Sequence, residues 1–144
     1  AERAIALNPN HAWTLAWTGT RIEHAGDERG IAWVRKAMKL DPFHPTNFNF
    51  SIAHHHFERG EYEEALAAAR KVNVPGLFWT QIYLAAIYAE LGRDSEARSA
   101  VEELLRIDPG FNTEKQIEEH RKWNSSDDRI QRWVAALRKA GLPE

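Results

Sequence analysis

Residues 84–109 read LAAIYAELGRDSEARSAVEELLRIDP, and this stretch decides the fold. Apolar residues recur at helical spacing around it, namely Ile82, Ala85, Ala86 and Ala89 before Gly92 and Ala97, Val101, Leu104 and Leu105 after it. This spacing predicts two amphipathic helices. Gly92 supplies a left-handed cap after the first helix, and Pro109 ends the second because proline lacks an N–H and clashes with the preceding turn. The stretch is therefore expected to form a helix hairpin.

Helix-ending prolines and glycines recur at regular intervals along the chain. Prolines close four similar triplets, Leu7-Asn8-Pro9, Leu40-Asp41-Pro42, Asn73-Val74-Pro75 and Ile107-Asp108-Pro109, and lie 33, 33 and 34 residues apart. Glycines between helical stretches, Gly26, Gly60 and Gly92, are spaced by 34 and 32 residues. A period of this length indicates a repeat protein in which each unit is a pair of helices.

In its recurring small and large positions, the chain resembles the tetratricopeptide repeat family. The family pattern runs Leu-Gly-x-x-Tyr, Ala-x-x-x-Phe and Pro, and it is matched best by Leu84-Ala85-x-x-Tyr88, Ala97-x-x-x-Val101 and Pro109. The resemblance implies an all-α fold, a right-handed superhelical solenoid of antiparallel helix pairs. Bulky side chains are excluded where the paired helices cross closely, and the small residues Gly19, Ala53 and Ala85 stand at these positions.

The expected organisation is a repeat region over residues 1–109 followed by a divergent pair of capping helices over 110–144. A partial repeat covers 1–10, and full repeats cover about 11–43, 44–76 and 77–109. Because 1–10 fits only the second helix of a repeat, the chain is expected to be part of a longer protein. In the second full repeat the proline follows Ala69 by only 6 residues, so a shortened second helix is expected there.

Two helices are expected after Pro109. A polar helix is expected over 113–123, and a second helix follows the capping residues Ser125-Ser126-Asp127-Asp128 and ends at Gly141. Its apolar face contains Ile130, Trp133, Val134 and Leu137. The tail from Trp133 to Glu144 also resembles the ends of repeat regions attached to bacterial class III adenylate cyclases or winged-helix regulators. That resemblance implies a signalling protein whose catalytic or DNA-binding domain precedes residue 1.

Composition excludes several classes of protein. The chain has 144 residues, 19 Lys and Arg against 21 Asp and Glu, and a net charge of −2, which does not favour nucleic acid or a membrane surface as partner. It has no cysteine, which is compatible with a cytoplasmic location and excludes disulfides and thiolate metal sites. No nucleophile motif or phosphate-binding glycine loop is present, so we expect no catalytic residue, no cofactor and no enzyme activity in this module.

The resemblance implies that the first helix of each hairpin lines a concave groove that binds a partner. The outward positions predicted to form it are Trp13, Thr20, His24, Asn47, Phe50, His54, Phe57, Trp79 and Ile82. Large aromatic side chains supply much of the binding energy in such surfaces. The alternative is that Trp13 and Trp79 pack between hairpins, while Trp17 and Trp33 are assigned to packing.

Charge at the predicted groove indicates the kind of ligand. Family members that clamp a terminal carboxylate use Lys, Arg and Asn, whereas this groove has Ala16, Thr20 and His54, with Glu23, Glu58 and Glu90 nearby. A neutral, apolar or basic peptide is therefore expected rather than an acidic tail.

The seven histidines raise the question of a metal site. His54, His55 and His56 point about 100° apart on a helix, so they cannot share one ion. A site across hairpins that uses His24, His54 and Glu58 remains open, as does a pH-sensitive interface. The favoured interpretation has no metal ligand.

Three functions follow in order of preference. The first is a non-catalytic regulatory module that binds a protein or peptide, or its own N-terminal domain, in the concave groove. The second is a scaffold that self-associates, for example as a homodimer. The third is a histidine-based metal site.

Overall fold

The computed structural model describes residues 11–144, which form eight α-helices and one short 3-10 helix without any strand. The helices are α2 (Ala12–His24), α3 (Arg29–Leu40), η1 (Thr46–Phe48), α4 (Asn49–Glu58), α5 (Tyr62–Ala69), α6 (Phe78–Glu90), α7 (Asp94–Ile107), α8 (Thr113–Lys122) and α9 (Asp127–Ala140). The prediction of an all-α fold is confirmed for this part of the chain. The partial repeat expected at 1–10 lies outside the described residues.

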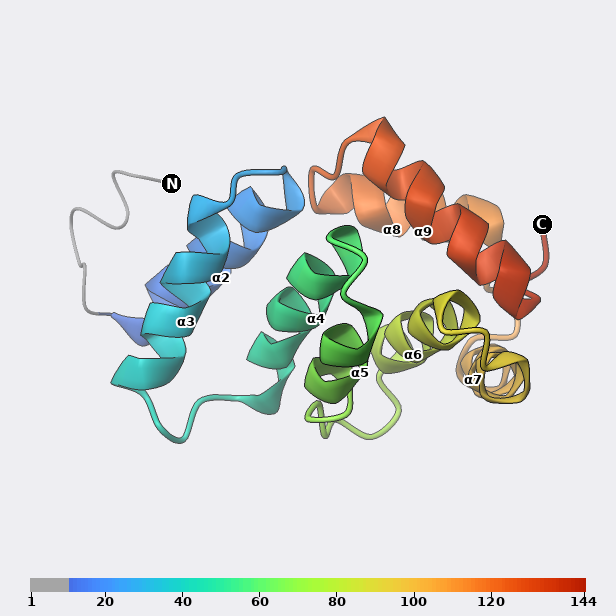
Figure 1. The fold of residues 1–144 in the computed structure, drawn as a ribbon, viewed down its shortest axis with the longest axis horizontal. Helices are drawn as coiled ribbons and strands as arrows, with labels where there is room; N and C mark the ends of the chain where they lie inside the picture. The colour runs from blue at the N-terminus through green and yellow to red at the C-terminus, as the bar shows by residue number, and fades with distance from the viewer. Residues whose placement is uncertain (1–10) are drawn as a thin grey trace.

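Successive helices pair as hairpins, α2 with α3, α4 with α5, α6 with α7 and α8 with α9. The first three hairpins follow one another along the long axis of the molecule (Figure 1). Neighbouring hairpins are joined by contacts of α4 with α2 and α3, and of α6 with α4 and α5. This is the arrangement of a helical solenoid, in which each unit buries its apolar face on the next.

Each of the first three hairpins turns at a glycine with positive φ, and the turn after α6 illustrates why. Gly92 has a φ of 71°, and beyond it the N–H of Arg93 donates to the carbonyl of Tyr88 at 2.9 Å. The left-handed residue therefore lets the chain satisfy a carbonyl at the end of α6 before α7 begins. Gly26 and Gly60 adopt the same conformation, so the periodic glycines predicted as caps are confirmed.

The second hairpin has a short second helix. The helix α5 has 8 residues, whereas the equivalent α7 has 14. The expectation of shortening is confirmed, and the chain runs through Pro75 and Gly76 without helix before α6 starts at Phe78.

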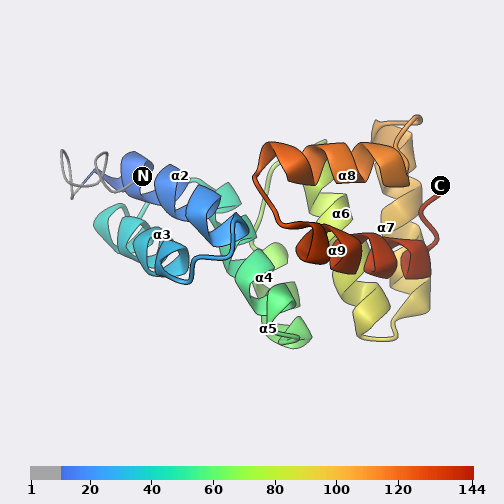
Figure 2. The same ribbon diagram turned by 90° about the horizontal axis from the view of Figure 1, so that it is seen from above.

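The C-terminal pair folds back over the inner helices of the repeats. The helix α9 packs extensively on α6 and also touches α7, and Figure 2 shows α8 and α9 lying across this part of the molecule. The predicted apolar face is buried, with Trp133 at 0% exposure. The two ends of the pair are held together because the N–H of Thr113 donates to the carbonyl of Pro143 at 2.9 Å. The pair therefore covers part of the groove as well as the end of the solenoid.

Most of the buried apolar residues fall into two clusters. The larger one extends from Ala53 on α4 to Leu142 beyond α9 and includes Phe57, Ile82 and Trp133. The smaller one joins α2 and α3 to Phe48. The first hairpin thus has a small apolar cluster of its own beside the larger cluster of α4–α9.

Candidate functional site

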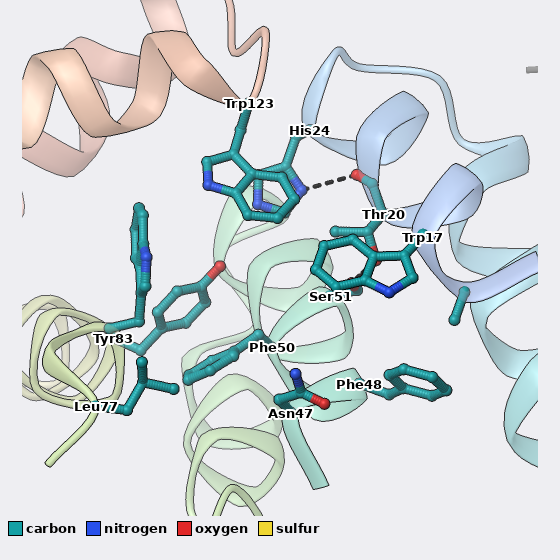
Figure 3. A pocket seen from close by; sticks show the side chains of 12 residues that line it. Trp17, Thr20, His24, Asn47, Phe48, Phe50, Ser51, Leu77, Tyr83 and Trp123 are labelled. Atoms are coloured by element: carbon teal, nitrogen blue, oxygen red, sulfur yellow. Dashed lines mark hydrogen bonds between the residues drawn. The ribbon is translucent and has the colours of Figure 1, made fainter. Parts of the chain in front are cut away.

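A pocket of about 200 Å³ opens between α2, α4, α6 and the end of α8 (Figure 3). Its lining consists of Ala16, Trp17, Thr20, His24, Asn47, Phe48, Phe50, Ser51, Leu77, Trp79, Tyr83 and Trp123. The first helices of three successive hairpins thus supply most of the wall, and Trp123 closes it from the C-terminal pair. Among residues 11–144, no Asp, Glu, Lys or Arg belongs to this lining.

Aromatic rings form the sides of the pocket. Trp17 stacks on Trp123 with ring centroids 5.9 Å apart, and Phe50 contacts Tyr83 at 4.9 Å. Figure 3 shows these two pairs on different sides of the cavity. Such rings offer a large apolar contact area with few rotatable bonds, which favours an apolar side chain as occupant.

A few polar groups lie on the wall between α2 and α4. The hydroxyls of Thr20 and Ser51 hydrogen-bond to each other at 2.6 Å, and Nδ1 of His24 donates to the carbonyl of Thr20 at 2.9 Å. The buried Oδ1 of Asn47 has no hydrogen-bond partner among the described residues.

Five predicted groove residues line this pocket, namely Thr20, His24, Asn47, Phe50 and Trp79. Trp13 lies beside it, 44% exposed, stacked on Trp17 at 6.2 Å and edge-on to Phe48 at 5.6 Å. The position of Trp79 partly fits the alternative interpretation, because its ring also packs on Phe78.

For three other residues, the prediction that they line an open groove is wrong. His54, Phe57 and Ile82 are each 0% exposed and present no surface to a partner. The reason is the C-terminal pair, whose Trp133 stacks on Phe57 at 4.0 Å and on His54 at 5.6 Å. Ile82 is enclosed in the same large core cluster. The inner face predicted to be open is filled at these positions by the chain itself.

Two residues of the pocket were missed by the sequence interpretation. Trp17, assigned to packing, is 45% exposed and lines the pocket. The sequence offered one indication of this position. Trp17 follows Trp13 by four residues, so the two side chains lie on the same face of one helix. Trp123 follows a polar helix outside the repeats, and nothing in the repeat pattern indicated that it would return to α2. Trp33 packs on the smaller core cluster as expected.

Next to the pocket, two histidines and a glutamate meet in the interior. The rings of His24 and His54 stack with centroids 4.0 Å apart, and both Nδ1 atoms lie near the Glu23 carboxylate. Trp123 contacts His24 on one side and Trp133 stacks on His54 on the other. The C-terminal pair therefore encloses the imidazoles between two indoles.

Burial and mutual contact set the charges of this group. Burial lowers the pKa of His24, as does the neighbouring His54. Burial alone would raise the pKa of Glu23, but the electrostatic attraction of His54 and the close contacts of both imidazoles hold it far below its ordinary value. Glu23 is thus ionised beside a neutral His24 at neutral pH.

The glutamates expected to make the groove acidic are engaged by α9. Glu58 accepts from Nε1 of Trp133 at 2.9 Å and lies 3.3 Å from Nη1 of Arg132. Glu90 lies 3.9 Å from Nζ of Lys139. The expected preference for a basic ligand therefore loses its electrostatic basis.

Comparisons with known proteins support one class. A tetratricopeptide repeat family profile matches residues 84–111, the stretch that forms most of the third hairpin. The chain is also 24% identical over 116 residues to the TPR repeat-containing protein YpiA of Bacillus subtilis, a match that covers 76% of this chain and 26% of that protein.

The helix hairpins and the matched repeat support assignment of this chain to the tetratricopeptide repeat family. Repeats of this family generally mediate protein–protein interactions and are typically non-catalytic. The aligned part spans about a quarter of the length of the Bacillus subtilis relative. Across residues 11–144, no helix is both long and apolar enough to cross a membrane.

Proposed function

We propose that this module binds an extended segment of a partner protein and takes one large apolar or aromatic side chain of it into the pocket between α2, α4, α6 and Trp123. The observation that carries the proposal is the pocket itself, with a partly exposed aromatic wall and no charged lining from Asp, Glu, Lys or Arg within residues 11–144. A peptide with a neutral anchor matches that surface.

Size supports a side chain rather than a whole cofactor. Sites for small molecules generally have about 300–1,000 Å³, whereas this pocket has about 200 Å³. The groove beyond it is occupied by α8 and α9, so an extended segment fits the space better than a helix laid along the solenoid.

The test is selection of short random peptides on the purified chain, followed by affinity measurement on the selected sequences. Trp17→Ala is the informative variant, because Trp17 is 45% exposed and lines the pocket. Loss of an aromatic anchor costs about 2 kcal/mol, so we expect roughly 30-fold weaker binding. Selected peptides should share one large apolar residue.

Phe43→Ala is the matched control, since Phe43 is an aromatic residue exposed to 94% and lies outside the pocket. Binding of the selected peptides should be unchanged in this variant. Equal affinity of wild type and Trp17→Ala would contradict the proposed site. A wild-type dimer that Trp17→Ala dissociates, seen by sedimentation, would instead favour the self-associating scaffold.

The proposal also concerns the longer protein to which this module belongs. The resemblance of the tail from Trp133 to Glu144 supports a cytoplasmic bacterial signalling protein, either a cyclase or a transcriptional regulator, as the parent. Cyclase and DNA-binding assays on the full-length gene product test it, and absence of both activities would contradict it.

A further inference from the structure

Three potential ligand atoms converge in the interior where α2 meets α4. Nδ1 of His54 lies 2.9 Å from Oε2 of Glu23, and Nδ1 of His24 lies 3.3 Å from the same oxygen. Each of the three residues offers a ligand atom within 4.8 Å of the other two. In a tetrahedral zinc site with bonds of about 2.0–2.1 Å, neighbouring ligand atoms are about 3.3 Å apart. The ligand atoms are thus close to the spacing that a bound ion requires, and the two stacked imidazoles must tilt apart to direct both Nδ1 lone pairs at it.

The contacts of Oε2 differ from ordinary hydrogen bonds. This oxygen is buried, and despite the two short distances neither imidazole donates a well-directed hydrogen bond to it. His54 directs its hydrogen bond to the other oxygen, Oε1, at 3.2 Å. A buried carboxylate oxygen faced by two ring nitrogens without hydrogen-bond geometry has an unused lone pair.

We propose that Glu23, His24 and His54 form a binding site for a divalent transition-metal ion, with Zn²⁺ as the best match. Two imidazoles and one carboxylate are a ligand set that zinc accepts, whereas magnesium and calcium prefer oxygen ligands. The ion takes the Nδ1 lone pair of each neutral imidazole, and the ring proton passes through solvent from Nδ1 to Nε2, so both rings stay neutral. His24 then gives up its hydrogen bond to the carbonyl of Thr20.

Access and charge agree with this assignment. His24 lines the aromatic pocket, and Glu23 lines a second, polar pocket bounded by α9, so the group stands in the wall between two openings. Solvent from either pocket can supply the fourth ligand. The cation also balances the buried negative charge of the Glu23 carboxylate.

The ligand set proposed here differs from the one predicted from the sequence. His24 and His54 do meet across the hairpins, but Glu58 is turned toward Trp133 and Arg132. Glu23 takes its place because it precedes His24 on α2. The metal would tie the first hairpin to the second.

The test is a titration of the full 144-residue chain, freed of metal with a chelator and carrying no histidine tag. Co²⁺ is added first, because four-coordinate Co²⁺ has distinctive visible absorption, and Zn²⁺ is then used to displace it. One ion per chain is expected. Glu23→Gln and His54→Gln should each bind roughly 10-fold more weakly or worse.

His56→Gln is the control, because His56 lies on the same helix and pairs with the Glu61 carboxylate at 2.6 Å outside the cluster. Its affinity should equal that of the wild type. Circular dichroism establishes that each variant is folded, and His24→Gln replaces any variant that is not. Absence of binding to the wild type, or equal binding by wild type and the cluster variants, would overturn the proposal.

Discussion

At the scale of single residues, a pair of glycines lets the backbones of α2 and α3 touch. A β-carbon on Gly30 would lie 2.3 Å from the carbonyl oxygen of Gly19 and 2.6 Å from the backbone nitrogen of Glu23. Both of these atoms belong to the backbone of α2, so no side-chain rotation can relieve the overlap. The close crossing therefore fixes the position of α2, including Glu23, relative to α3.

We predict that Gly30→Ala destabilises the protein. The added methyl group forces α2 and α3 apart, and overpacking of this kind costs about 1–3 kcal/mol. Urea denaturation should show a lower midpoint for the variant. Gly110→Ala is the control, because a β-carbon there would meet only Oδ1 of Asp108 at 3.8 Å. Equal urea midpoints for the two variants would contradict the prediction that a methyl group at Gly30 forces α2 and α3 apart.

At the scale of helices, the repeat pattern predicted the hairpins because it depends on local features. Gly26, Gly60 and Gly92 end helices by their own conformation, and an early Pro75 accounts for the short α5. The small residue Gly19 was likewise predicted to stand at a crossing, and the structure places it against Gly30. Signals of this type act within a few residues and can be read from a single chain.

The path of the C-terminal pair could not be predicted in the same way. Trp133 was correctly placed on a buried face, but an apolar pattern does not indicate which surface covers it. That surface is set by the turn after Trp123, where Asn124 has a φ of 60°, and by long-range contacts with α4 and α6. For this reason Phe57 was assigned to an open groove that α9 fills.

The interface between α8 and the repeats carries a pH dependence through His120. This ring is buried and contacts Trp79 at 5.7 Å and Trp133 at 5.4 Å. Burial, followed by the charges of His54 and His24, lowers the pKa of His120 to about 3. In an unfolded chain a histidine has a pKa of about 6.5, so between these values the unfolded state binds the proton and the native state does not.

We therefore predict that acid weakens the fold. The free energy of unfolding should fall as the pH drops from about 6.5 toward about 3, by up to ~1.4 kcal/mol per pH unit from His120 alone. Urea denaturation at several pH values measures this slope, which His120→Phe should reduce. Gln116→Leu changes a buried but non-titrating residue of the same helix and should keep the wild-type slope. If His120→Phe leaves the pH dependence of the unfolding free energy unchanged, His120 is not its source.

At the scale of the whole molecule, the two core clusters divide the structure into unequal parts. The cluster of α4–α9 is large and continuous, whereas α2 and α3 share a small one with Phe48. Contacts from the C-terminal pair bridge the parts, because Arg129 donates to the carbonyl of Glu23 at 3.0 Å and Trp123 stacks on Trp17. The first hairpin thus depends on residues about 100 positions away in sequence.

This division predicts unequal protection against hydrogen exchange. Amides of α2 and α3 should exchange faster than those of α6 and α9, because opening the first hairpin exposes only the smaller cluster. Trp123→Ala removes one of the bridging contacts, so it should accelerate exchange in α2 and leave α7 unaffected. Mass spectrometry of peptic fragments resolves these helices. Uniform acceleration in all helices would mean that the chain opens only as one unit, and the pocket would then form and disappear with the entire fold.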